Sequence, residues 1–141
     1  MHETEILRQD FKIQADASKL SEFRTKLCEL CAGEGIPAPA LRLIVLAVDE
    51  AVSNIIEHAT LSEDDRRITI SVEIGEKKLT VSIRDRGLPF DPTPNRREPD
   101  QKSYPRRGFG LYLIHKIVDN IAYERTPDGH NVLTLTKVLE R

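Results

Sequence analysis

The sequence predicts an α+β sandwich, in which one mixed, mostly antiparallel sheet is covered on one face by three helices. Two pairs of alternating apolar segments are each separated by a short turn, as in antiparallel hairpins. Two helical segments lie between an N-terminal strand and the first hairpin and a third lies between the two hairpins, whereas a doubly wound parallel fold would alternate more regularly. With 141 residues, the chain is predicted to form a single domain, residues 1–141.

The N-terminal half predicts one strand and two helices. Residues 4–15, "TEILRQDFKIQA", partly alternate between polar and apolar side chains and predict an edge strand. The segment "DASKLSEFRTKLCELCAGEG" predicts a helix capped by Ser18 that stops at Gly33 or Gly35. Residues 36–59 form the strongest helical pattern, with two prolines at the start. Its expected core stripe is Leu41, Val45, Val48, Val52, Ile55 and Ala59.

The C-terminal half predicts two hairpins that flank a long loop and a helix. Residues 68–87, "ITISVEIGEKKLTVSIRDRG", alternate on both sides of a turn at 75–78. Residues 88–107 contain five prolines, too many for a regular element, and a loop of this length in a compact domain is usually functional or disordered. The position of this loop, between the first hairpin and the next helix, predicts a lid over a binding site. A helix from Gly110 to about Asp119 follows, and then a hairpin that turns at Asp128-Gly129.

The composition indicates an ordinary globular chain. Hydrophobic residues make up 39% and charged residues 31%, and the net charge of -2 disfavours direct binding to nucleic acid. The first ten residues, "MHETEILRQD", are charged rather than apolar, and no apolar run reaches the length of a membrane span. We therefore expect no membrane association and a cytoplasmic location.

Two cysteines, Cys28 and Cys31, are separated by two residues. This spacing allows a redox interpretation, but the surrounding helical pattern favours packing, with Cys31 in the core and Cys28 at its edge. A redox pair of this spacing would open a helix after a strand, whereas this pair lies near a helix end. A zinc site lacks a second pair of ligands.

Three short motifs contain residues that could act in catalysis or bind a ligand. Glu50 and Asn54 are four apart on a helix, away from its apolar stripe, where a carboxylate could accept a proton and an amide oxygen could bind Mg²⁺. Asp85 and Gly87 end a strand and could accept an exocyclic amine beside a flat ring. The segment 108–110, "GFG", opens a helix whose N-terminus suits phosphate. Separately, the motifs are equally compatible with a solvated helix face, a polar turn and a helix cap.

Together and in this order, the motifs resemble the ATP-binding fold of the GHKL superfamily, which includes gyrase, Hsp90, histidine kinases and MutL. The segments "DEAVSNIIEHA", "DRGLPFD" and "RRGFGLYLIHKIVD" look most like those of its single-domain branch, the anti-sigma-factor serine/threonine kinases. The resemblance covers at least residues 41–120. It implies a two-layer sandwich of the Bergerat type, with an ATP lid at about 88–107.

The resemblance also implies a role for each matching residue. Glu50 is expected to be the catalytic base, and Asn54 the ligand that holds Mg²⁺ against the phosphates of ATP. Asp85 would bind the adenine amino group, with Gly87 making room for the ring. The remaining nucleotide-binding positions are Arg106, as the candidate for the γ-phosphate, Gly108 and Gly110, which offer backbone N–H groups, and the adjoining Phe109 and Leu111.

The match to the superfamily departs from its common pattern at one position. Pro89 stands where many members have the second glycine of D-x-G-x-G, and the D-x-G-x-x-F-D form of the anti-sigma kinases fits this segment better. The resemblance further implies an anti-anti-sigma (STAS-type) protein substrate, a sigma factor as a second partner, and a homodimer. Two other functions stay open, namely a nucleotide-sensing binding module without kinase activity and an ATPase that acts on water.

Overall fold

The computed structural model describes residues 6–58, 66–89, 91 and 112–140. Its elements are β1 (Leu7–Gln14), α1 (Ala17–Gly33), α2 (Ala38–His58), β2 (Arg67–Ile74), β3 (Lys78–Asp85), β4 (Asn120–Arg125) and β5 (Asn131–Val138). Residues 112–117 are also helical. Most of the predicted lid, 88–107, lies outside the described residues.

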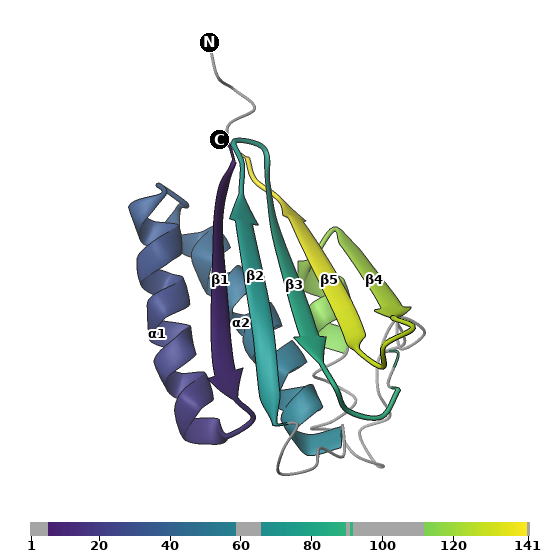
Figure 1. The fold of residues 1–141 in the computed structure, drawn as a ribbon. Helices are drawn as coiled ribbons and strands as arrows, with labels where there is room; N and C mark the ends of the chain where they lie inside the picture. Colours follow the sequence, from purple (N-terminus) through teal and green to yellow (C-terminus); the bar gives the residue numbers. More distant parts are fainter. Residues whose placement is uncertain (1–5, 59–65, 90, 92–111, 141) are drawn as a thin grey trace, which may run out of the picture.

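The five strands form one sheet in the order β1-β2-β3-β5-β4. All four pairings between the described strands are antiparallel. The helices lie on one side of this sheet (Figure 1), and the strands accordingly bury alternate residues, as in β2 and β3. The predicted two-layer α+β sandwich is therefore confirmed.

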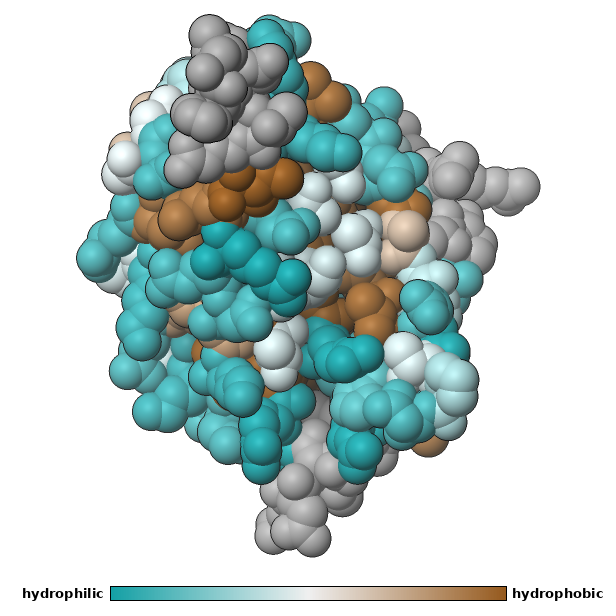
Figure 2. All heavy atoms as spheres, turned by 45° about the horizontal axis from the view of Figure 1, so that its top comes forward, coloured by the Kyte–Doolittle hydropathy of each residue, from teal (hydrophilic) through white to brown (hydrophobic). Residues whose placement is uncertain are grey.

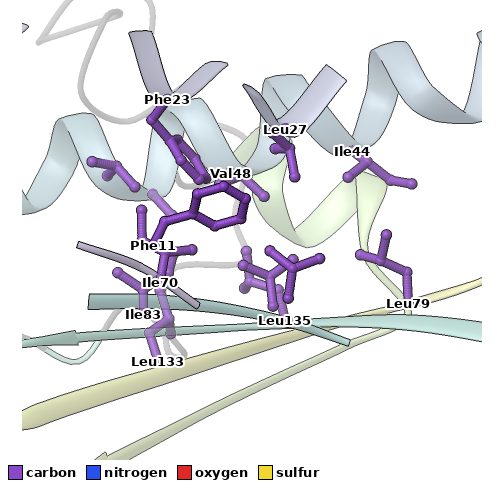
Figure 3. Packing of buried hydrophobic residues seen from close by; sticks show 14 of the residues in the cluster. Phe11, Phe23, Leu27, Ile44, Val48, Ile70, Leu79, Ile83, Leu133 and Leu135 are labelled. Carbon is purple, nitrogen blue, oxygen red and sulfur yellow. The ribbon is translucent and has the colours of Figure 1, made fainter. Parts of the chain in front are cut away.

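The hydrophobic core fills the space between the helices and the sheet. Figure 3 shows side chains of α1 and α2 pointing towards those of the strands, with the Phe11 and Phe23 rings side by side. Their centroids are 5.2 Å apart and their planes meet at 75°, the edge-to-face arrangement that aromatic rings favour. Leu27 and Ile70 are also fully buried. This packing joins α1 and α2 to the same face of the sheet.

Of the local predictions about the helices, the cap of α1 is wrong and the core stripe of α2 is too narrow. Asp16, rather than Ser18, caps α1, because the Asp16 carboxylate accepts the Ser18 N–H at 2.7 Å. The predicted stripe of α2 is confirmed at Val48, Val52 and Ile55, which are all buried, while Leu41 and Val45 are partly buried and Ala59 lies outside the described residues. The buried face also extends beyond the stripe to Ile44, which is 2% exposed. The cause is that α2 packs against both α1 and the sheet, so a wider arc of its surface is covered.

The face of the molecule drawn in Figure 2 is largely hydrophilic. Figure 2 shows hydrophobic side chains in several areas of one face, separated by hydrophilic ones. The exposed large apolar residues of the described part are Ile6, Leu7, Leu43, Leu46, Leu88 and Val138. No described helix is both long enough and apolar enough to cross a membrane.

The two cysteines are placed as the packing interpretation predicts. Cys31 is fully buried and Cys28 is partly buried, and both are free thiols. Burial, together with the neighbouring Cys28, raises the pKa of the Cys31 thiol to about 11. At pH 8 only about 0.1% of such a thiol is ionised, and the thiolate is the reactive form.

We therefore expect a disulfide reagent at pH 8 to modify Cys28 quickly in the native protein and Cys31 only after unfolding. The measurement is the number of thiols titrated with Ellman's reagent before and after adding guanidinium chloride. Cys28→Ser should remove the fast thiol and leave the slow one. Two thiols of equal rate in the folded chain would contradict the buried placement of Cys31.

Candidate nucleotide site

Three polar side chains of the described part are buried, and all three lie at the same end of the molecule. They are Asn54, Asp85 and Asn131, which are 6%, 3% and 4% exposed. Asn54 is near the C-terminal end of α2, Asp85 ends β3, and Asn131 begins β5. All three of these chain segments lie towards the lower end of the molecule in Figure 1. Buried polar groups are costly unless they are paired, so a cluster of them indicates a functional site.

Asp85 is held at the end of β3 by two hydrogen bonds. Its Oδ1 accepts the Gly87 backbone N–H at 2.8 Å and the Asn131 side-chain amide at 3.0 Å. The Gly87 bond turns the chain directly after the strand, as an aspartate two residues upstream often does. Both bonds end on Oδ1, and neither uses Oδ2. The predicted amine acceptor is thus a buried, oriented carboxylate.

Asn54 is buried rather than exposed, which corrects the expectation that it lies away from the core-facing side of the helix. Its Nδ2 has no hydrogen-bond partner in the part of the chain that the structure describes. A buried, unpaired amide is rare in proteins and is explained when a ligand supplies the partner. Since the amide oxygen and nitrogen exchange places by a half-turn, the same side chain can present either atom to a ligand.

Glu50 lies one helical turn before Asn54 and is partly buried. The preceding residue, Asp49, links α2 to α1, because its Oδ1 accepts two hydrogen bonds from Arg24, at 2.9 Å from Nε and 2.5 Å from Nη2. This ion pair is also partly buried. It therefore ties α2 to α1 at the residue next to Glu50.

Asn131 is a site residue that the sequence reasoning missed. It lies opposite Asp85 in the β3–β5 register. The available signal was a polar residue at an inward position of a strand that otherwise alternates as "VLTLT". Its proximity to Asp85 depends on the pairing of β5 with β3, which are far apart in the sequence. Local pattern could therefore indicate a buried polar residue at this position, but not its contact with Asp85.

The turn between β4 and β5 borders the site. Arg86 Nε donates to His130 Nε2 at 3.1 Å, so this side chain of the D-R-G motif reaches the turn. His130 Nδ1 lies 3.1 Å from Asp128 Oδ1. Hydrogen bonding from Thr126, and then from His130, lowers the pKa of Asp128 to about 2. The turn therefore stays polar and charged next to the site, and Gly129 adopts a φ of 88° within it.

Five predicted site residues lie outside the described residues. They are Arg106, Gly108, Phe109, Gly110 and Leu111. The helical segment 112–117 that follows them packs into the core through Ile114, which is fully buried. Among the described residues, the structure therefore brings Asp85, Gly87 and Asn54 to one end of the fold, with Glu50 one turn before Asn54 on α2.

The described residues contain no group of three or more His, Cys, Asp or Glu side chains that could hold a metal by themselves. Mg²⁺ that is bound together with a nucleotide does not need such a group, because it usually takes one or two protein oxygens and completes its shell with phosphates and water. The buried amide of Asn54 offers one such oxygen.

The chain is similar to proteins of established families over nearly its whole length. The family model described as "Histidine kinase-like ATPase domain" matches residues 13–137. A serine-protein kinase RsbW of Listeria monocytogenes serotype 4a (strain HCC23) is 30% identical over 117 residues, covering 78% of this chain and 74% of the relative. An RsbW of Bacillus cereus (strain ATCC 10987 / NRS 248) is 29% identical over 139 residues, covering 94% and 85%.

Two solved structures have the same fold. The crystal structure of the RsbU and RsbW domains of Rv1364c from Mycobacterium tuberculosis matches 96% of this chain with a TM-score of 0.71 at 20% identity, and this chain spans 33% of that one. The SiaB-SiaC complex from Pseudomonas aeruginosa matches 96% of this chain and 92% of that chain, with a TM-score of 0.63 at 18% identity. The chain belongs to the histidine kinase-like ATPase family and, within it, to the branch of the RsbW-type serine-protein kinases.

Proposed function

We propose that the chain binds ATP at the end of the sheet where Asn54, Asp85 and Asn131 are buried. This gathering of buried polar side chains is the observation that carries the proposal. The Asp85 carboxylate is an acceptor suited to the exocyclic amine of adenine. Gly87 is buried next to it and has no side chain to obstruct a flat ring. Membership of a family of ATPases supports the assignment.

The phosphates of ATP would extend from this point towards α2 and the N-terminus of the helical segment 112–117. Asn54 holds Mg²⁺ through its amide oxygen, and the bound ion supplies neutralisation of phosphate charge. We assign the remaining contacts to the segment outside the described residues. Gly108 and Gly110 donate backbone N–H groups, Arg106 binds the γ-phosphate, and Phe109 and Leu111 line the nucleotide.

The reaction that we propose is transfer of the γ-phosphoryl group to a serine or threonine hydroxyl. Glu50 accepts the hydroxyl proton, a new bond forms between that oxygen and phosphorus, and the bond from phosphorus to the oxygen of the leaving ADP breaks. Glu50 suits this role because it lies one turn from Asn54 on a helix that the Arg24 to Asp49 ion pair holds in place. The serine-protein kinase relatives support this chemistry.

We further propose that the chain acts in the cytoplasm as an anti-sigma factor that exchanges partners. A STAS-type anti-anti-sigma protein is the phosphorylated substrate, and a sigma factor is the protein sequestered when that antagonist is released. The active form is a homodimer. Names of relatives and the SiaB-SiaC complex are consistent with a regulator that works through protein partners.

The test begins with capture of partners from the source cell by the full chain in the presence of ADP or ATP. A captured STAS-type protein is then purified and incubated with the chain, ATP and Mg²⁺. We expect one phosphorylated serine or threonine, mapped by mass spectrometry, with one ADP formed per phosphate transferred. Capture that depends on the nucleotide without any transfer would instead support a nucleotide-sensing module, and ADP formed without phosphoprotein would support an ATPase acting on water.

A further inference from the structure

The Asn131 side chain is the centre of a hydrogen-bond network that extends beyond Asp85. Its Nδ2 lies 3.0 Å from Asp85 Oδ1, 3.2 Å from the Gly87 carbonyl oxygen and 3.0 Å from the Leu88 carbonyl oxygen. One amide nitrogen thus contacts the last residue of β3 and two of the three residues that follow it. Since an amide nitrogen carries only two protons, at least one of them is shared between two of these acceptors.

The opposite atom of the same amide is held from β4. Asn131 Oδ1 accepts the Tyr123 hydroxyl at 2.5 Å and the Arg125 Nη1 at 3.2 Å. The same Arg125 nitrogen donates to the Gly87 carbonyl at 2.7 Å. Two donors on Oδ1 leave one orientation for the amide, in which Nδ2 faces Asp85, because the flipped amide would place its N–H groups against those donors.

The strand register places these groups on the same side of the sheet. Arg125 pairs with Asn131 across β4 and β5, and Asn131 pairs with Asp85 across β5 and β3. Residues paired directly across strands share a face, and Tyr123, two residues before Arg125, shares it too. The network is therefore built from three adjacent strands and does not depend on the segment outside the described residues.

We propose that Asn131 is a positioning residue for nucleotide recognition, oriented by Tyr123 and Arg125. By binding Oδ1 of Asp85, it sets the rotation of the carboxylate and leaves Oδ2 as the acceptor for the 6-amino group of a purine nucleotide. By binding the Gly87 and Leu88 carbonyl oxygens, it holds the backbone that borders the ring. The proposal rests on the proposed nucleotide site and adds the groups that give it selectivity for an amino-purine.

The test compares two nucleotides that differ only at the 6-amino group. The full chain is titrated with ADP and with purine riboside 5′-diphosphate, which has hydrogen in place of the amine, and each Kd is measured by calorimetry. We expect the wild type to prefer ADP. Asn131→Ala should weaken ADP binding about tenfold and change binding of the deamino analogue much less, so that the preference falls.

Two further variants make the comparison specific. Tyr123→Phe removes one donor to Asn131 and keeps the ring, so it should lower the preference in the same direction but by a smaller factor, and it tests the network even if Asn131→Ala folds poorly. Asn120→Ala, at the exposed start of β4 at the opposite end of the sheet, should leave both affinities unchanged. Thermal unfolding of each variant verifies that the chain is folded.

The outcomes separate this proposal from the proposed function. If the wild type prefers ADP and Asn131→Ala or Tyr123→Phe weakens both nucleotides by the same factor, Asn131 has a purely structural role and the inference is overturned, while the nucleotide site stands. If the wild type binds both nucleotides equally, Asp85 does not contact the amine, and the assignment of Asp85 fails together with the inference. A selective loss of preference supports both.

Discussion

Replacing Glu50 with Gln is expected to slow phosphoryl transfer to the protein substrate by about 10²- to 10⁴-fold, the contribution typical of a general base. Glutamine has nearly the shape of glutamate but cannot take the hydroxyl proton. Glu50 is partly buried on α2, one turn before Asn54, so an amide at this position should disturb the helix little. The measurement is the single-turnover rate of phosphoprotein formation with excess chain and saturating ATP.

Nucleotide affinity separates this effect from damage to the site. The Kd for ADP should change less than about threefold in Glu50→Gln, because the loss lies in a proton transfer and not in binding. Glu29→Gln, at an exposed position of α1, serves as the matched control and should transfer phosphate at the wild-type rate. A Glu50→Gln chain with unchanged transfer would rule out Glu50 as the base.

Replacing Asp85 with Asn is expected to weaken ADP binding by about 10- to 100-fold, the range of a hydrogen bond to a charged group. The asparagine oxygen can still accept the Gly87 N–H and the Asn131 amide, which end on a single oxygen in the structure. Its nitrogen then takes the place of Oδ2 and turns a donor towards the adenine amine. The measurement is the Kd of ADP by calorimetry, at a temperature where both chains are folded.

Asp119→Asn is the matched control for this change. Asp119 also accepts a backbone N–H, from Val138 at 2.6 Å, but it is exposed and lies next to the start of β4, away from the buried cluster. The control should bind ADP as the wild type does. Undiminished ADP binding by Asp85→Asn would show that the carboxylate has no part in recognising adenine.

The fold class followed from local pattern. Period-two alternation predicted both hairpins, and the apolar spacing of residues 36–59 predicted the long helix that the structure shows as α2. These signals are reliable because each strand or helix buries one face, and the repeat of that face appears directly in the sequence. The cap of α1 was misassigned because Asp16 and Ser18 are both good capping residues and only backbone geometry distinguishes them.

The burial of Asn54 could not be predicted from the helix alone. On an isolated helix, Glu50 and Asn54 lie outside the apolar stripe, and such residues usually face water. In the folded chain α1 covers one side of α2 and the sheet covers another, so the buried arc extends to Asn54. Packing of two neighbours, rather than the periodicity of one helix, determines the exposure of a residue at the edge of the stripe.

The sequence by itself determined the order of the elements, the family resemblance and the candidate residues Glu50, Asn54, Asp85 and Gly87, because each depends on residues close together in the chain. Only the tertiary structure decided that Asn131 joins Asp85 and that Tyr123 and Arg125 orient it. Those contacts require β5 to lie between β3 and β4. Strand order and register are set by long-range pairing, which leaves no local repeat in the sequence.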